Sequence, residues 1–225
     1  MRGALITFRA NGRTCDGYLS LPASLPAPAV IVIQGWWGLV DHIKGVTDRL
    51  AGEGFVGLAP DLYRGKRTSE PDDAERLMMA LNIAQTEKDL RGAVQFLLDH
   101  EAVASARVGI LGFCMGGQLA LFAACANAGI RACVDFYGFH PKVQPDLAGL
   151  QAPVLGLFAE NDEYIPLATV ESLKSALRTH GKKATFHIYP GAMHGFFNDT
   201  SPRRYHPASA KDAWEKTLAF LRSHL

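Results

Sequence analysis

A cysteine lies at the centre of a pattern that favours nucleophilic chemistry. Residues 112–116 read Gly-Phe-Cys-Met-Gly, between an apolar strand-like run and an Ala- and Leu-rich helical run. Glycines two positions before and after Cys114 let a strand and a helix approach closely around a sharp turn. A helix N-terminus favours the thiolate, and the backbone N–H of Met115 can point at a developing oxyanion. We therefore predict that Cys114 is a nucleophile, whereas Cys125 and Cys133 are expected to be buried and inert.

His194 is the candidate base for this thiol. The loop at 190–196 reads Pro-Gly-Ala-Met-His-Gly-Phe after the last predicted strand, and its glycines give His194 freedom to reach a nucleophile. A neutral imidazole can take the thiol proton and later protonate the leaving group. His140 and His206 also lie in predicted loops and remain alternatives. The other histidines are expected on helix surfaces, in a strand or beside the chain end: His42, His100, His180, His187 and His224.

Asp162 is the candidate partner of the histidine. It lies in a loop after another predicted strand, where a carboxylate can accept the second imidazole N–H and fix its orientation. Glu160 and Glu163 flank it and are alternatives. The chain order of nucleophile, acid and histidine is the order of the α/β-hydrolase fold.

A sheet must bring these side chains together. Apolar runs alternate with amphipathic stretches, which predicts parallel strands joined by helices. Asn11-Gly12 predicts a turn between opening strands at 5–8 and 18–21. We predict one α/β domain over residues 1–225, with the α/β-hydrolase fold: a doubly wound, mostly parallel sheet with helices on both faces. The expected strands are 29–34, 55–59, 107–112, 132–136, 153–158 and 184–189, and the expected helices are 41–53, 70–100 (broken near 81–85), 115–127, 167–180 and 209–221.

Composition excludes several classes of function. The net charge is +1, which gives no electrostatic case for binding nucleic acid or an anionic membrane. No apolar run approaches the roughly 18 residues of a membrane span, and polar residues interrupt the N-terminal segment too early for a signal peptide. The cysteines have no zinc-like spacing. We expect a cytoplasmic protein without a metal, and a monomer because no long exposed apolar stripe is evident.

The motifs together resemble the dienelactone hydrolase family over nearly the whole chain. The strongest matches are Gly-Phe-Cys-Met-Gly-Gly at 112–117, Pro-Asp-Leu-Tyr at 60–63, Tyr137-Gly138 and Ala-Met-His-Gly-Phe at 192–196. The resemblance implies a hydrolase of small-molecule esters or lactones that works through a thioester acyl-enzyme and needs no cofactor. It also implies an oxyanion hole formed by the backbone N–H groups of Trp36 and Met115.

Two departures from the family pattern bear on mechanism and substrate. Gly35 stands where the family usually has an acid beside the nucleophile, so we expect Cys114 to rest partly ionised against His194. Asn198 stands where dienelactone hydrolases proper have a substrate-binding arginine, and Arg76 is the nearest candidate for a second such arginine. An aromatic-lined pocket for a neutral or mono-anionic substrate is expected instead. The candidate substrate-binding residues are Trp37, Arg76, Tyr137 and Phe196, with Trp36, Phe136 and Phe197 as further aromatics.

Two other classes of function compete with hydrolysis. The missing acid at Gly35 is compatible with a hydrolase-fold protein that binds a small molecule without turning it over. Cys114 is also a candidate redox-sensing thiol, although the sequence offers no obvious resolving cysteine. Within the enzyme class, a thioesterase or a small-ester carboxylesterase is the alternative to a lactonase.

Overall fold

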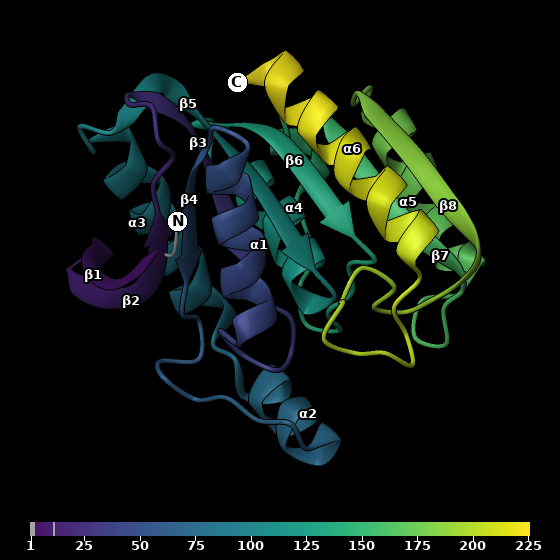
Figure 1. The fold of residues 1–225 in the computed structure, drawn as a ribbon. Helices are drawn as coiled ribbons and strands as arrows, with labels where there is room; N and C mark the ends of the chain where they lie inside the picture. Colours follow the sequence, from purple (N-terminus) through teal and green to yellow (C-terminus); the bar gives the residue numbers. More distant parts are fainter. Residues whose placement is uncertain (1–2, 11) are drawn as a thin grey trace.

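One eight-stranded sheet forms the centre of the computed structural model, which describes residues 3–10 and 12–225 (Figure 1). Its strands are β1 (Ala4–Ala10), β2 (Arg13–Ser20), β3 (Ala27–Ile33), β4 (Val56–Pro60), β5 (Val103–Phe113), β6 (Ile130–Phe136), β7 (Val154–Asn161) and β8 (Ala184–Met193). Their order across the sheet is β1-β2-β4-β3-β5-β6-β7-β8. β2 pairs antiparallel with β1 and β4, and the strands from β4 to β8 are parallel.

Helices cover both faces of this sheet. They are α1 (Asp41–Gly52), α2 (Pro71–Ala80), α3 (Ile83–Leu98), α4 (Met115–Ala126), α5 (Leu167–Thr179) and α6 (Pro207–His224), with a short 3₁₀ turn at Leu147–Gly149. α1 and α6 lie over one face, and α3, α4 and α5 lie over the other (Figure 1). The predicted doubly wound, mostly parallel architecture is therefore confirmed. None of the helices in the described ranges is long and apolar enough to cross a membrane.

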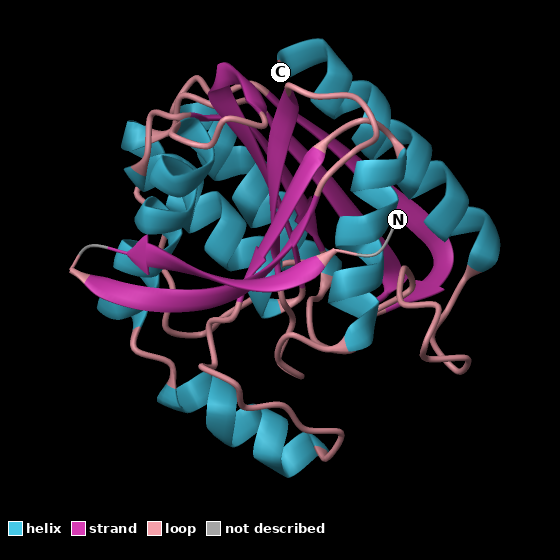
Figure 2. Ribbon diagram, turned by 60° about the vertical axis from the view of Figure 1, so that its left-hand side comes forward, coloured by secondary structure: helices cyan, strands magenta, loops and turns pink. Residues whose placement is uncertain are grey.

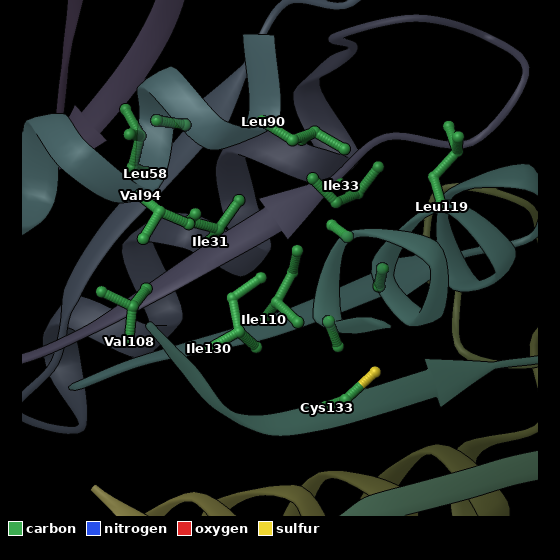
Figure 3. Packing of buried hydrophobic residues seen from close by; sticks show 14 of the residues in the cluster. Ile31, Ile33, Leu58, Leu90, Val94, Val108, Ile110, Leu119, Ile130 and Cys133 are labelled. Carbon is green, nitrogen blue, oxygen red and sulfur yellow. The ribbon is translucent and has the colours of Figure 1, made fainter. Parts of the chain in front are cut away.

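Strand β3 shows why the sequence folds into these layers. Ile31 and Ile33 pack into the core on the α3 and α4 side, whereas Val30 and Val32 pack into the core on the α1 and α6 side. Figure 3 shows the first of these cores, with Ile31 and Ile33 close to residues of α3 and α4. Successive side chains of a strand point to opposite faces, so a strand covered on both faces must be apolar at every position.

The opening hairpin is longer than predicted. β1 and β2 pair from Ala4 opposite Leu19 to Ala10 opposite Arg13. Phe8 is buried and lies 5.3 Å from Phe96 of α3, measured between ring centroids. One face of a hairpin at the sheet edge is solvated, so polar residues extend these strands beyond their apolar centres. The predicted turn residue Asn11 lies outside the described residues.

The helical region predicted over 70–100 consists of two helices with a break inside the expected interval. Leu81 has extended backbone angles after α2, and the side chain of Asn82 caps α3 by accepting the N–H of Gln85 at 3.0 Å. Only Ala74 of α2 is buried, and α2 projects from the body of the molecule (Figures 1 and 2). The segment that leads into α2 therefore lies beside the carboxyl edge of the sheet.

Candidate active site

Cys114 occupies a sharp turn between β5 and α4. Its φ of 56° and ψ of −125° are unusual for a residue with a side chain. The backbone is held there because Cys114 donates its N–H to Phe136 O at 3.0 Å and accepts the N–H of Gly117 at 2.9 Å. The turn places the Cys114 side chain at the first residue of α4, where the helix dipole favours an anion.

Glycines make this turn sterically possible. A Cβ atom on Gly112 would overlap the carbonyl oxygen of Gly116, and a Cβ on Gly116 would overlap the carbonyl oxygen of Gln34. The close packing of β3, β5 and α4 therefore requires glycine at both positions. The flanking Pro-Asp-Leu-Tyr segment joins the same packing, because Leu62 N–H donates to Gln34 Oε1 at 3.3 Å and Tyr63 Oη donates to Met115 Sδ at 3.2 Å.

His194 and Asp162 meet beside this turn. His194 Nδ1 lies 2.8 Å from Asp162 Oδ2, and the two side chains are 10% and 1% exposed. The second carboxylate oxygen accepts the N–H groups of Tyr164 and Ile165, each at 2.9 Å. Asp162 is thus fixed by its own loop and can hold the imidazole in one orientation.

Cys114 lines the same pocket as His194 and interacts with it electrostatically. Burial lowers the pKa of His194, but the negative charge of a Cys114 thiolate and the hydrogen bond to Asp162 outweigh burial and raise this pKa to about 10. This arrangement is electrostatically suited to a thiolate paired with an imidazolium.

The alternative carboxylates and histidines have other partners. Glu160 accepts the N–H of Gly191 at 2.8 Å, and Glu163 forms an ion pair with Arg204. His206 caps α6 by accepting the N–H of Ser209. His140 is buried away from this site, and its Nδ1 accepts the N–H of Lys142 at 3.1 Å. Of the residues considered from sequence, the structure brings Cys114, His194 and Asp162 together.

A pocket of about 520 Å³ opens above these side chains. It is lined by Cys114 and His194 together with Trp36, Trp37, Tyr137 and Tyr164 among its aromatic residues. The ring centroids of Trp36 and Trp37 lie 5.0 Å apart, and those of Trp36 and Tyr164 lie 6.0 Å apart. The pocket walls therefore offer aromatic surface to a ligand within reach of the thiol.

Two residues expected to bind substrate lie elsewhere. Arg76 is on the projecting helix α2, 75% exposed and paired with Asp73, and it does not line the pocket. Phe196 is fully buried behind the pocket, where its ring packs against Tyr137 and Tyr189. Both predictions were wrong for physical reasons. The position of Arg76 depends on how the preceding loop folds. Phe196 is an apolar ring in a glycine-rich loop, and such a ring packs equally well in a core or in a pocket wall.

The pocket also contains residues that the sequence analysis did not assign to it. His42 was expected on a helix surface, but it is buried on α1, lines the pocket and lies 3.4 Å from Asp199. Val46 and Leu50 follow His42 by one and two helical turns, so this spacing places His42 on the buried face of α1 and could have predicted its burial. Arg204 also lines the pocket, but it lies in the loop between β8 and α6, where no local sequence pattern predicts its position.

Gly35 lies directly beside the thiol. A Cβ atom at this position would lie 3.7 Å from Cys114 Cβ and 3.5 Å from Phe113 O, which are ordinary contact distances. A Cβ atom is therefore sterically tolerated at this position. Within the described ranges, no group of three or more His, Cys, Asp or Glu side chains is arranged to hold a metal ion.

Comparison with known proteins identifies the family. Residues 15–225 match the model of the dienelactone hydrolase family. Protein usf of Aquifex pyrophilus is 34% identical over 230 residues, which cover 99% of each chain. The protein named "Putative carboxymethylenebutenolidase" of Aquifex aeolicus is 32% identical over 230 residues, again with 99% of each chain covered.

The fold agrees with these sequence matches. The crystal structure described as a "Putative Dienelactone Hydrolase" from Klebsiella pneumoniae superposes with a TM-score of 0.90 at 31% identity, covering 99% of this chain and 98% of the other. The residues matched by the family model include strands β3 to β8 and the pocket residues from Gly35 to Arg204. The chain has the α/β-hydrolase fold and belongs to the dienelactone hydrolase family of hydrolases.

Proposed function

We propose that the protein hydrolyses carboxylic esters or lactones of small molecules, with Cys114 as nucleophile, His194 as acid and base, and Asp162 as the group that orients His194. One observation carries the proposal: His194 is hydrogen-bonded to Asp162 and lines the same aromatic pocket as Cys114, with which it interacts electrostatically. A protein that only binds ligands has no need for a nucleophile beside a base.

The first half of the reaction forms a thioester. The Cys114 thiolate attacks the substrate carbonyl carbon, forming a C–S bond and a tetrahedral oxyanion. The backbone N–H groups of Trp36 and Met115, after β3 and at the start of α4, stabilise this oxyanion. Collapse breaks the C–O bond, and the leaving alkoxide takes the proton of the His194 imidazolium. In a lactone, that alkoxide stays on the acyl group.

The second half returns the enzyme to its starting state. His194 takes a proton from a water molecule while the oxygen of that water attacks the thioester carbon. The C–S bond breaks, Cys114 leaves as the thiolate, and His194 keeps the proton. The net reaction adds one water to one ester bond, and the thiolate–imidazolium pair is restored without a cofactor.

The pocket supports a neutral or mono-anionic substrate that carries an apolar or aromatic group. Arg204 is the one lysine or arginine among its described lining residues, and Asn198 lines it where an arginine binds substrate in dienelactone hydrolases proper. The relatives named as carboxymethylenebutenolidases support lactones as one substrate class. Aryl esters suit the tryptophans at the pocket wall.

Turnover of two model substrates tests this proposal. We expect the wild-type protein to hydrolyse p-nitrophenyl acetate, and to show no strong preference for dienelactone, which is a carboxylate-bearing lactone. A preference for dienelactone above roughly a hundredfold in kcat/KM, equivalent to about 2.7 kcal/mol, would contradict the assignment of substrate. Absence of turnover with both compounds would favour the small-molecule-binding function instead.

A further inference from the structure

Three consecutive residues of the loop after β7 are linked to the same histidine, two by direct contact and one through Arg204. Asp162 binds the imidazole, with 2.8 Å between Oδ2 and Nδ1. Glu163 forms an ion pair with Arg204, whose Nη1 donates to the backbone oxygen of His194 at 3.1 Å. The ring of Tyr164 lies edge-on to the imidazole, with 5.0 Å between ring centroids. The loop therefore contacts both the side chain and, through Arg204, the backbone of His194.

Arg204 links Glu163 to the backbone of His194. Its guanidinium carbon lies 5.7 Å from the centroid of the Tyr164 ring, and its Cδ would lie 3.6 Å from a Cβ on Gly195. Its side chain is 34% exposed and that of Glu163 is 37% exposed, so the ion pair alone contributes little to stability. A planar guanidinium can nevertheless serve a carboxylate and a carbonyl together, because it has five donors in a fixed geometry.

The backbone beside His194 needs such a restraint. Gly195 has a φ of 79°, and Gly191 on the other side has a φ of 71°. Glycine adopts many backbone conformations at low cost, so within this loop the peptide of His194 is restrained by the turn in which Phe196 N–H donates to Met193 O at 3.1 Å. Asp162 orients the imidazole ring through Nδ1, but it does not bind the backbone of His194.

We propose that Arg204 is a positioning residue: held by Glu163, it fixes the His194 peptide so that the imidazole reaches Cys114. This proposal rests on the function proposed above, because positioning matters only if His194 acts on the thiol. The Asp162–His194 contact and the Glu163–Arg204 contact then form a closed ring of interactions through neighbouring residues of one loop. Arg204 itself need not contact the substrate.

Three variants and one matched control test the proposal: Arg204→Gln, Glu163→Gln, the double variant, and Arg203→Gln at the exposed neighbouring arginine. We expect Arg204→Gln to lower kcat for p-nitrophenyl acetate by at least about tenfold, within the range caused by small misplacements of catalytic groups, with KM changed less than about twofold. Glu163→Gln should have a smaller effect in the same direction. The double variant should be no slower than Arg204→Gln, because both substitutions break one network. Arg203→Gln should match the wild type.

A second readout needs no substrate turnover. Iodoacetamide labelling of Cys114 between pH 6 and 8 reports how well His194 supports the thiolate, and we expect Arg204→Gln to slow it at the lower pH values while His194→Ala slows it more. This readout separates the two proposals: a wild type that hydrolyses neither compound defeats the proposed function, yet a slower labelling of Arg204→Gln still supports positioning.

Other results would overturn the role of Arg204. A wild-type kcat and labelling profile in folded Arg204→Gln would do so. So would a rise in KM confined to anionic esters, which would make Arg204 a substrate-binding residue. Thermal unfolding identifies folded variants, and if Arg204→Gln does not fold, Glu163→Gln decides: unchanged kcat and labelling in that variant would contradict the proposal.

Discussion

At the residue scale, the surroundings of Cys114 decide its resting state. Burial lowers the pKa of His194, but the negative charge of a Cys114 thiolate and the contact with Asp162 raise it to about 10. An imidazolium with a raised pKa keeps its proton as pH rises, and it loses that proton only near pH 10. We propose that Cys114 rests as a thiolate paired with the His194 imidazolium, and the reactivity of the thiol tests this proposal.

Restoring an acid at position 35 should suppress this pair. In Gly35→Glu, a carboxylate built from a Cβ 3.7 Å from Cys114 Cβ would place a like charge beside the thiolate. We expect iodoacetamide labelling of Cys114 at pH 7 to slow by about tenfold, which corresponds to about 1.4 kcal/mol against the thiolate. The wild type should label readily below about pH 8, under the ordinary thiol range.

Gly35→Gln is the matched control for the carboxylate, because it has the same size without the charge. It should label within about threefold of the wild type if the effect is electrostatic. Equal slowing in both variants would show that bulk, not charge, separates Cys114 from His194. A wild-type thiol that is unreactive below pH 8 would contradict the resting ion pair itself.

Residue types and chain order pointed to Cys114, Asp162 and His194, because each follows a strand end in a recognisable local pattern. The positions of Arg204 and Arg76 could not be predicted in this way. Both are arginines in or after long loops, and the sequence suggested a pocket position for Arg76, whereas the structure places Arg204 there. No local pattern encodes how a loop of irregular backbone folds back over the sheet.

At the element scale, the junction of β6 and α4 contains a buried acid. Asp135 is fully buried at the end of β6, and a Cβ on either Gly117 or Gly138 would overlap its Oδ1. Burial raises the pKa of Asp135 from 3.8 to about 7, although the backbone N–H of Gly138 partly offsets this. The carboxyl group thus packs against the first turn of the helix that carries Cys114.

The raised pKa of Asp135 makes the stability of the fold depend on pH. Between the ordinary value of 3.8 and about 7, the folded protein holds a proton that the unfolded chain has lost, so the free energy of unfolding falls as pH rises. Asp135→Asn removes this titration. We expect the variant to gain roughly 2–4 kcal/mol relative to the wild type between pH 4 and pH 7.5.

Urea unfolding of both proteins across this pH range measures the difference directly. The difference in unfolding free energy between variant and wild type should increase up to about pH 7 and then remain constant, since both states of the wild type are deprotonated above that value. A difference independent of pH would show that Asp135 does not titrate in this range.

The helices and strands were predictable where their buried positions coincide with the apolar residues of the sequence. β3 is apolar at every position, β5 and β6 have apolar centres, and α1 and α4 carry apolar residues at helical spacing. The observed ends of a strand differ from the predicted ends where pairing with a neighbouring strand extends it. β8 continues to Met193 and β7 to Asn161 through polar or exposed positions, because the two strands pair again at Asn161 and Met193 after a change of register.

At the scale of the whole molecule, the site exists because parallel strands end at one edge. β3, β5, β6, β7 and β8 each deliver one of its segments there, so residues more than a hundred positions apart meet in one pocket. The alternation of strands and helices predicts that edge, and the family match agrees with it. A sixth segment after β4 contributes Thr68, Ser69 and Pro71, and the shape of the pocket depends on how all these segments pack together, which periodicity does not describe.

The proposed mechanism depends most on Cys114 as the nucleophile that forms a thioester. The direct measurement is p-nitrophenyl acetate hydrolysis by the wild type, Cys114→Ala and His194→Ala, with intact-protein mass after rapid acid quench to detect an acetyl group on Cys114. We expect each variant to lose at least roughly a hundredfold in kcat/KM, and the wild type alone to show the cysteine adduct. A Cys114→Ala variant that keeps wild-type turnover would contradict the account.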